Sequence, residues 1–137
     1  MESIRILTVD DFPETHELLE AHLCAEAVRI VARCPSAGRA LIRADALRPD
    51  VVIADVWLPD MSGFKLVEVL KRQNPKLKII LTSGGEYRDE AILAGADTFK
   101  PKEHLFKELI WTIRGLFPHR FKPANVVLSG AVEARNV

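Results

Sequence analysis

The sequence contains one run that specifies its expected fold most clearly, Val51-Val52-Ile53-Ala54-Asp55-Val56-Trp57-Leu58-Pro59-Asp60-Met61-Ser62-Gly63. Its first four residues are apolar and favour a buried strand, and Asp55 follows them directly. Pro59 and Gly63 indicate that a turn comes next. The run therefore predicts a carboxylate at the rim of a buried sheet.

A second apolar run, Ile4-Arg5-Ile6-Leu7-Thr8-Val9, ends in the acidic pair Asp10-Asp11. If the two runs form parallel strands, they bring three carboxylates to one edge of the sheet. Clustered carboxylates repel one another, and a divalent cation is the usual remedy. The two runs together predict a metal-binding edge.

Apolar runs of strand length alternate with longer amphipathic stretches along the chain, which is the pattern of a doubly wound α/β sheet. We expect five strands, at 4–10, 28–33, 51–55, 78–82 and 97–101. We expect five helices, at 14–27, 36–47, 63–73, 86–94 and 103–117, of which the fourth is short.

Length and charge narrow the class of protein. The 137 residues fit one domain, and 19 basic residues balance 19 acidic ones, so no basic field favours nucleic acid. The chain shows no signal sequence and no long apolar segment, which predicts a soluble cytoplasmic protein without membrane contact. Cys24 and Cys34 lack metal-ligand spacing and are expected to be ordinary buried or half-buried thiols.

The last twenty residues differ in character from the rest, with Pro118, Pro123 and Gly130 interrupting them. We therefore expect a domain over 1–117 and a C-terminal extension over 118–137 that forms no separate domain. The apolar run 124–128 leaves two interpretations open. The extension is either loosely ordered, or a strand or clip that packs on the domain or on another copy.

Polar residues stand at four predicted strand ends, where the ligand site of an open parallel sheet forms. They are Asp10, Asp11, Asp55, Thr82 and a lysine after the fifth strand. Each has an ordinary explanation when taken singly, as a helix cap, a turn residue or a solvated cation. Their joint occurrence at one edge of one sheet favours a functional site.

This set resembles the receiver domain of two-component response regulators, including the single-domain chemotaxis regulators, over residues 3–117. The resemblance implies a flavodoxin-like sheet in the order 2-1-3-4-5. It also implies Mg²⁺ held by Asp10, Asp11, Asp55 and the backbone carbonyl of Trp57. Asp55 would be the phosphoacceptor, with Thr82 and Lys102 contacting the phosphate.

The phosphate-contacting lysine has two candidates in Phe99-Lys100-Pro101-Lys102. In the family an aromatic residue commonly stands three positions before the lysine, which favours Lys102. A Lys-Pro pair is also common there, which keeps Lys100 as the alternative. Strand alternation points both side chains to the same side, so periodicity does not separate them.

The resemblance also implies a switch, in which phosphate at Asp55 draws Thr82 inward and Phe99 moves into the vacated space. The output surface would then be helix 86–94, strand 97–101 and helix 103–117. The segment between Thr82 and Gly95 is slightly short for the family, so the fourth helix is expected to be abbreviated. Trp57 either lines the mouth of the site or covers the loop as a surface aromatic.

We therefore interpret the chain as a phosphoacceptor signalling protein, whose only chemistry is its own phosphoryl transfer and autodephosphorylation. Its expected partners are a sensor histidine kinase or a histidine phosphotransfer protein and a downstream protein target, with a homodimer as an open alternative. A second hypothesis is a degenerate receiver that binds proteins without phosphorylation. A third, an aspartyl-nucleophile phosphatase, is disfavoured because Trp57 stands where that class has a second aspartate.

Overall fold

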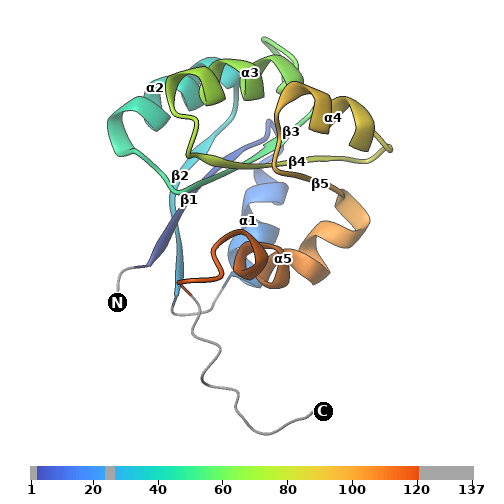
Figure 1. The fold of residues 1–137 in the computed structure, drawn as a ribbon. Coiled ribbons are helices and arrows are strands. Elements are labelled where there is room, and N and C mark those ends of the chain that lie inside the picture. Colours follow the sequence, from blue (N-terminus) through green and yellow to red (C-terminus); the bar gives the residue numbers. More distant parts are fainter. Residues whose placement is uncertain (1–2, 24–26, 121–137) are drawn as a thin grey trace, which may run out of the picture.

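Strands and helices alternate along the chain in the computed structural model, which describes residues 3–23 and 27–120. The strands are β1 (Ile4–Val9), β2 (Val28–Cys34), β3 (Val51–Asp55), β4 (Lys78–Ser83) and β5 (Thr98–Pro101). The helices are α1 (Pro13–His22), α2 (Ala37–Leu47), α3 (Gly63–Gln73), α4 (Arg88–Ala94) and α5 (Lys102–Leu116). Figure 1 labels these elements.

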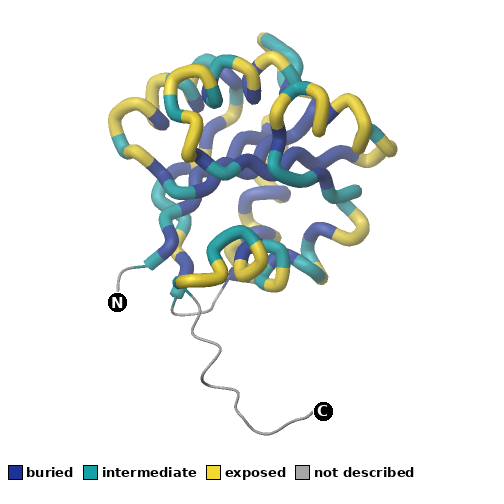
Figure 2. Tube along the Cα trace, in the orientation of Figure 1, coloured by how far each residue is buried: buried dark blue, intermediate teal, exposed yellow. Residues whose placement is uncertain are grey.

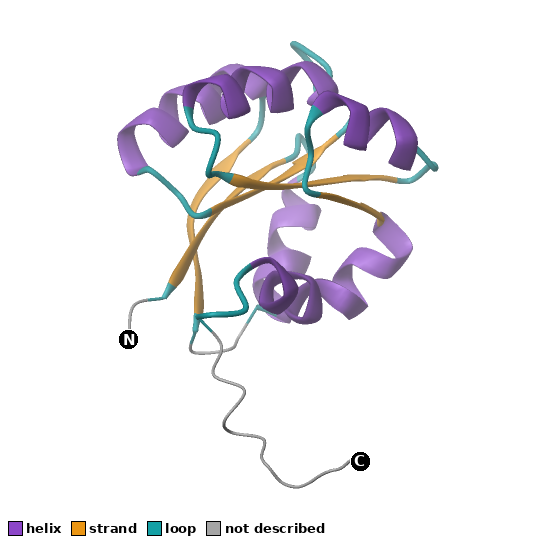
Figure 3. Cartoon of the chain, in the orientation of Figure 1, coloured by secondary structure: helices purple, strands orange, loops and turns teal. Residues whose placement is uncertain are grey.

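All neighbouring strands pair in parallel, in the order β2-β1-β3-β4-β5. Helices α2, α3 and α4 cover one face of the sheet, and α1 and α5 cover the other (Figures 1 and 3). This is the doubly wound arrangement that the sequence pattern predicts, with the flavodoxin-like strand order that the resemblance implies. Because the chain leaves β1 and β3 toward opposite faces, the strand order reverses between them, and a ligand site is expected at their carboxyl ends.

The sheet divides the hydrophobic core into two clusters, and Figure 2 shows the buried strands between the exposed outer helix faces. Val52 and Leu81 pack in the cluster under α2, α3 and α4, whereas Ile53 and Ile80 pack in the cluster with α1 and α5. Neighbouring strand residues thus face opposite layers, and both layers are apolar. For this reason every residue of β3 is buried and its sequence is nearly continuous in apolar residues.

Side-chain and backbone caps fix the helix boundaries. Ser36 and Ser62 precede α2 and α3, and their hydroxyls accept hydrogen bonds from the amides three residues later. Helix α4 ends at Gly95, whose φ of 110° lies in the left-handed region that favours glycine. These signals explain why α2 and α3 lie where the sequence predicts them, and why α4 is as short as expected.

The prediction for the first helix was wrong at its C-terminal end. Helix α1 ends at His22 instead of continuing to Ala27, and Leu18 within it is exposed. The Ala27 carbonyl accepts a hydrogen bond from the Ile4 amide, so residue 27 already belongs to the pairing of β1 with β2. The apolar spacing of Leu23 and Ala27 therefore reflects the approach to β2 and not another helical turn.

Two polar networks connect the strands and helices at the amino-terminal ends of the strands. The Asp97 carboxylate accepts hydrogen bonds from Lys71 Nζ and the Ile79 amide, both at 2.8 Å, and so joins α3, β4 and the start of β5. Arg5 Nη1 donates to the Leu47 carbonyl at 2.5 Å and to the Arg48 carbonyl at 2.9 Å. Asp97 and Arg5 therefore each have partners within hydrogen-bond distance where the strands begin.

Within residues 3–23 and 27–120, no helix is long and apolar enough to cross a membrane. Cys34 is buried at the end of β2, and burial raises the pKa of its thiol. Cys24 lies outside the described residues, as do positions 121–137 of the predicted C-terminal extension.

Candidate functional site

Asp10 and Asp55 meet at the carboxyl ends of β1 and β3, and the ammonium group of Lys102 lies between them. Lys102 Nζ is 3.0 Å from Asp10 Oδ2 and 2.9 Å from Asp55 Oδ2. The Asp10 and Asp55 side chains are only 2% and 8% exposed, whereas Lys102 is 25% exposed at the rim. The arrangement holds two nearly buried carboxylates around one cation.

The environment raises the proton affinities of both Asp55 and Lys102, for different reasons. Burial raises the pKa of Asp55, and it outweighs the Trp57 amide and Lys102, which both favour the ionised form. Burial on its own would lower the pKa of Lys102, but its bonds to Asp55 and Asp10 outweigh that effect, so its pKa is raised. Lys102 therefore stays charged, and the ionised form of Asp55 is held at a cost in free energy.

Lys100 and Lys102 have separate partners, although both follow Phe99. Lys100 lies opposite Thr82 in the pairing of β4 with β5, and its Nζ donates to Glu108 Oε1 at 2.6 Å. Lys102 is the first residue of α5, and it alone of the two contacts the carboxylates of the strand ends. The geometry favours Lys102 as the lysine of the site.

Thr82 and Ser83 end β4 beside Asp55, and both are buried. Thr82 pairs with Asp55 in the β-ladder, and its backbone carbonyl accepts from the Val56 amide at 2.9 Å. Its Oγ1 has no hydrogen-bond partner among the described residues. Ser83 Oγ instead accepts from the Gly85 amide at 3.2 Å and so shapes the loop before α4. A buried hydroxyl without a partner is costly and can serve an incoming acceptor atom.

The third acidic residue, Asp11, is exposed and lines a shallow cleft together with Asp10, Pro13, His16, Arg33 and Pro35. In the described part of the chain, no three acidic, histidine or cysteine side chains converge into a ready-made metal site. Mg²⁺ needs only one or two protein carboxylates and keeps several waters. The two converging carboxylates, with Asp11 beside them, are hard oxygen donors that fit Mg²⁺ in chemical type.

A tight loop over residues 55–63, which we call the acceptor loop, carries Asp55 into α3. The Trp57 amide donates to Asp55 Oδ1 at 3.0 Å, and the Gly63 amide donates to the Val56 carbonyl at 2.6 Å. A Cβ at Gly63 would lie 2.5 Å from the Asp55 carbonyl oxygen, so only glycine permits this closure. The acceptor loop presses closely against its own strand.

The Trp57 side chain turns outward from the acceptor loop and is 56% exposed. Its ring meets Tyr87 edge-on, with 5.5 Å between the ring centroids. Tyr87 in turn lies edge-on to Phe64, with a centroid distance of 6.2 Å. Trp57 therefore covers the junction of the acceptor loop with the loop before α4, which is the second of the two interpretations that the sequence left open.

Phe99 of β5, the predicted switch residue, is completely buried. Its carbonyl accepts a hydrogen bond from Arg88 Nη1 at 3.0 Å, and the Arg88 guanidinium carbon lies 5.8 Å from its ring centroid. Arg88 is the first residue of α4, so β5 and α4 are joined at this point.

Two residues that the sequence did not single out support the site. His16 Nε2 lies 2.8 Å from the Asp10 carbonyl oxygen, and because that oxygen only accepts, Nε2 carries the proton. In the neutral ring, Nδ1 then accepts from the Thr8 hydroxyl at 2.7 Å. Asp60, in the acceptor loop, accepts from the amides of Ala37 and Gly38. The sequence offered one signal for His16, a polar residue on the face of α1 that turns out to be buried.

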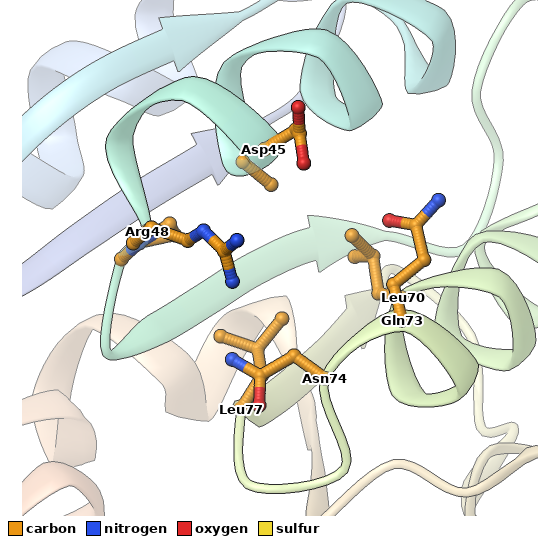
Figure 4. Close-up of a pocket in the computed structure, with 8 residues that line it drawn as sticks. Asp45, Arg48, Leu70, Gln73, Asn74 and Leu77 are labelled. Carbon is orange, nitrogen blue, oxygen red and sulfur yellow. The ribbon is translucent and has the colours of Figure 1, made fainter.

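Another cleft lies at the opposite edge of the sheet, between the C-terminal ends of α2 and α3 (Figure 4). Leu70 and Leu77 line its apolar part, and Arg48 and Asn74 border it. Arg48 has a φ of 52° and is the one non-glycine residue with a positive φ in the described ranges. None of the site residues predicted from the sequence lies in this cleft.

Comparison with known proteins agrees with this geometry. The family model for the response regulator receiver domain matches residues 6–114. The probable transcriptional regulatory protein TcrX of Mycobacterium tuberculosis is 33% identical over 116 residues, which cover 82% of this chain and 49% of that protein. The two-component response regulator PhoP of Pseudomonas aeruginosa is 35% identical over 112 residues, covering 77% and 48%. The chain thus spans about half the length of these curated relatives.

A solved complex of CheX with CheY, BeF₃ and Mg²⁺ from Borrelia burgdorferi has the same fold. Its TM-score is 0.78 at 20% identity, over 85% of this chain and 90% of that one. At this identity the likeness shows the fold alone. With the family match running over most of the sequence, from β1 into α5, this chain belongs to the response regulator receiver domain family.

Proposed function

We propose that this protein is a phosphoacceptor switch, in which Asp55 takes a phosphoryl group from a sensor histidine kinase or a histidine phosphotransfer protein. One observation carries the proposal: Lys102 Nζ lies within 3.0 Å of both Asp10 and Asp55. Thr82 pairs with Asp55 on the neighbouring strand, and its hydroxyl has no hydrogen-bond partner in the described part of the chain. This edge offers a nucleophile, a fixed cation and a free hydrogen-bond donor for a phosphoryl group.

In the proposed transfer, Asp55 Oδ2 forms the new bond to phosphorus. The bond from phosphorus to the donor breaks, and the donor leaves as a histidine imidazole or, with acetyl phosphate, as acetate. An anionic nucleophile and an anionic donor repel each other, so positive charge has to be present before they meet. Lys102 supplies one such charge, and Thr82 donates one hydrogen bond to a phosphoryl oxygen.

We further propose that Asp10, Asp11, Asp55 and the backbone carbonyl of Trp57 hold Mg²⁺. When bound, this ion would neutralise charge on the phosphoryl oxygens and on the acidic residues. The oxygen-rich donor set and the convergence of Asp10 with Asp55 support this assignment. The related CheY complex contains Mg²⁺ by its own description.

The proposed output is protein binding through α4, β5 and α5. Thr82 would turn toward the phosphoryl group, and Phe99 would then move into the space beside it. Leu93 on α4 and Trp111 on α5 are strongly exposed apolar side chains, and they give this surface an apolar contact area for a partner. A downstream protein is the partner we favour, and a second copy of the chain is the alternative. We place this signalling in the cytoplasm.

Intact mass spectrometry after incubation with Mg²⁺ and acetyl phosphate tests the proposal. The wild-type protein should gain one phosphoryl group, Asp55→Asn should gain none, and EDTA should abolish labelling. Asp11→Asn should weaken Mg²⁺ binding, as followed by the fluorescence of Trp57 and by calorimetry. Labelling of Asp55→Asn at another residue would refute Asp55 as the acceptor.

Two alternatives predict different results in the same assay. A degenerate receiver would stay unlabelled while still binding its protein partner. An aspartyl-nucleophile phosphatase would turn over a phosphate monoester many times, and we expect no such turnover because Trp57 offers no general acid.

A further inference from the structure

We propose that Asp60 is a positioning residue for the acceptor, because its carboxylate anchors the tip of the acceptor loop on the N-terminus of α2. Asp60 Oδ1 accepts from the Ala37 amide at 2.9 Å, and Oδ2 accepts from the Gly38 amide at 2.8 Å. The partners are 23 and 22 residues apart in sequence. The bonds therefore tie together two segments that would otherwise be independent.

The N-terminus of α2 is suited to hold this carboxylate. Its first amides point out of the helix without intrahelical partners, and the helix dipole favours negative charge there. These amides, that of Gly38 first and then that of Ala37, lower the pKa of Asp60. A Cβ at Gly38 would lie 3.2 Å from Asp60 Oδ2, so a larger residue at 38 would crowd the contact.

Helix α2 also has a cap of its own. This cap makes it possible to distinguish a role of Asp60 in stabilising α2 from a role in restraining the acceptor loop. The Ser36 hydroxyl accepts from the Arg39 amide at 3.2 Å, within the same segment of chain. If Asp60 served only to stabilise α2, its removal would resemble the removal of the Ser36 cap. The bonds of Asp60 differ because they also restrain the segment that carries Asp55.

The acceptor loop is built to transmit a restraint at its tip. Its base is closed by the bond from the Gly63 amide to the Val56 carbonyl and by the bridge between Trp57 and Ser62. The Trp57 amide holds Asp55 Oδ1 directly. With base and tip both fixed, the peptide of Trp57 keeps its orientation toward the acceptor carboxylate. If the bonds of Asp60 are removed, only the bonds at its base hold the acceptor loop in place.

The test compares Asp60→Ala and the milder Asp60→Asn with Ser36→Ala, which removes a cap of α2 but leaves the acceptor loop untouched. The first measurement is hydrogen exchange at the amides of Trp57 and Gly63, which needs no phosphorylation. We expect exchange to become about fivefold faster in Asp60→Ala, the factor for a lost cap. Asp60→Asn should be intermediate, and Ser36→Ala should leave both amides unchanged.

The second measurement is the rate of labelling by acetyl phosphate at saturating and at limiting Mg²⁺. It rests on the proposed function, whereas the exchange measurement does not. We expect Asp60→Ala to label several-fold more slowly than Ser36→Ala, with weaker apparent Mg²⁺ affinity. Equal exchange in Asp60→Ala and Ser36→Ala would overturn the proposal. Faster exchange in a protein that is never labelled would instead support the anchor and refute the phosphoacceptor function.

Discussion

Replacing Lys102 with alanine should destabilise the metal-free protein and make its stability more dependent on Mg²⁺. The ammonium group is the one cationic side chain that contacts both Asp10 and Asp55 in the described structure. Without it, two nearly buried carboxylates face each other with no neutralising charge. The proposed Mg²⁺ site exists only in the folded state, so Mg²⁺ should then recover more of the lost free energy of unfolding than it adds to wild type.

The structure sets the size of the effect. Removing one partner from a fully buried ion pair costs roughly 3–5 kcal/mol. Lys102 is 25% exposed, so water can replace part of its interaction with Asp10 and Asp55. We therefore expect a loss of about 2 kcal/mol in the free energy of unfolding for Lys102→Ala at neutral pH without metal.

Urea unfolding in EDTA and in Mg²⁺ measures this loss in the free energy of unfolding, with Lys100→Ala as the matched control. Lys100 pairs with Glu108, whose side chain is 46% exposed, so the removal of Lys100 should have little effect in either buffer. The loss in Lys102→Ala should shrink as the pH falls toward 4, because protonated carboxyls no longer need the cation. Equal stability of the two variants in EDTA, or a loss independent of pH, would refute this account of the Lys102 contacts.

Two further predictions concern the strand ends. Because burial raises the pKa of Asp55, the ionised carboxylate disfavours the folded state. Asp55→Asn should therefore stabilise the metal-free protein at neutral pH. This gain should vanish in acid, where Asp55 is protonated in the folded and in the unfolded state. Thermal unfolding from pH 4 to pH 8 would show it, and a gain that grows in acid would contradict it. His16→Gln keeps a donor near the Asp10 carbonyl, whereas His16→Asn places its amide near Thr8. Mg²⁺ titration should find weaker binding in His16→Asn alone, and equal affinities would rule out His16 as a support for Asp10.

Most of the fold could be predicted from the periodicity of the sequence. The run 51–55 reads as a buried strand because both faces of β3 are covered, and the serine caps set the starts of α2 and α3. The end of α1 could not be predicted in this way. Leu23 and Ala27 have helical spacing, but the pairing of Ala27 with Ile4 determines the backbone there, and that contact is distant in sequence.

The convergence of Asp10 with Asp55 could be predicted, because it follows from residue type and from the positions of two strand ends. The choice between Lys100 and Lys102 depended on where β5 gives way to α5, and alternation along a strand carries no information beyond that point. Asp60 and His16 act on backbone groups of other segments. The partners of such contacts leave no pattern in the sequence, because any residue can supply a backbone amide or carbonyl.

The two edges of the sheet differ in how well their polar groups are satisfied. At the edge where the strands begin, Asp97 and Arg5 each have two hydrogen-bonding partners. Where the strands end, Asp55 is buried at a cost, and the Thr82 hydroxyl has no hydrogen-bond partner in residues 3–23 and 27–120. The local structure should therefore be more stable where the strands begin than where they end. Thermal opening should begin at the carboxyl ends of the strands, and a phosphoryl group bound there would oppose it.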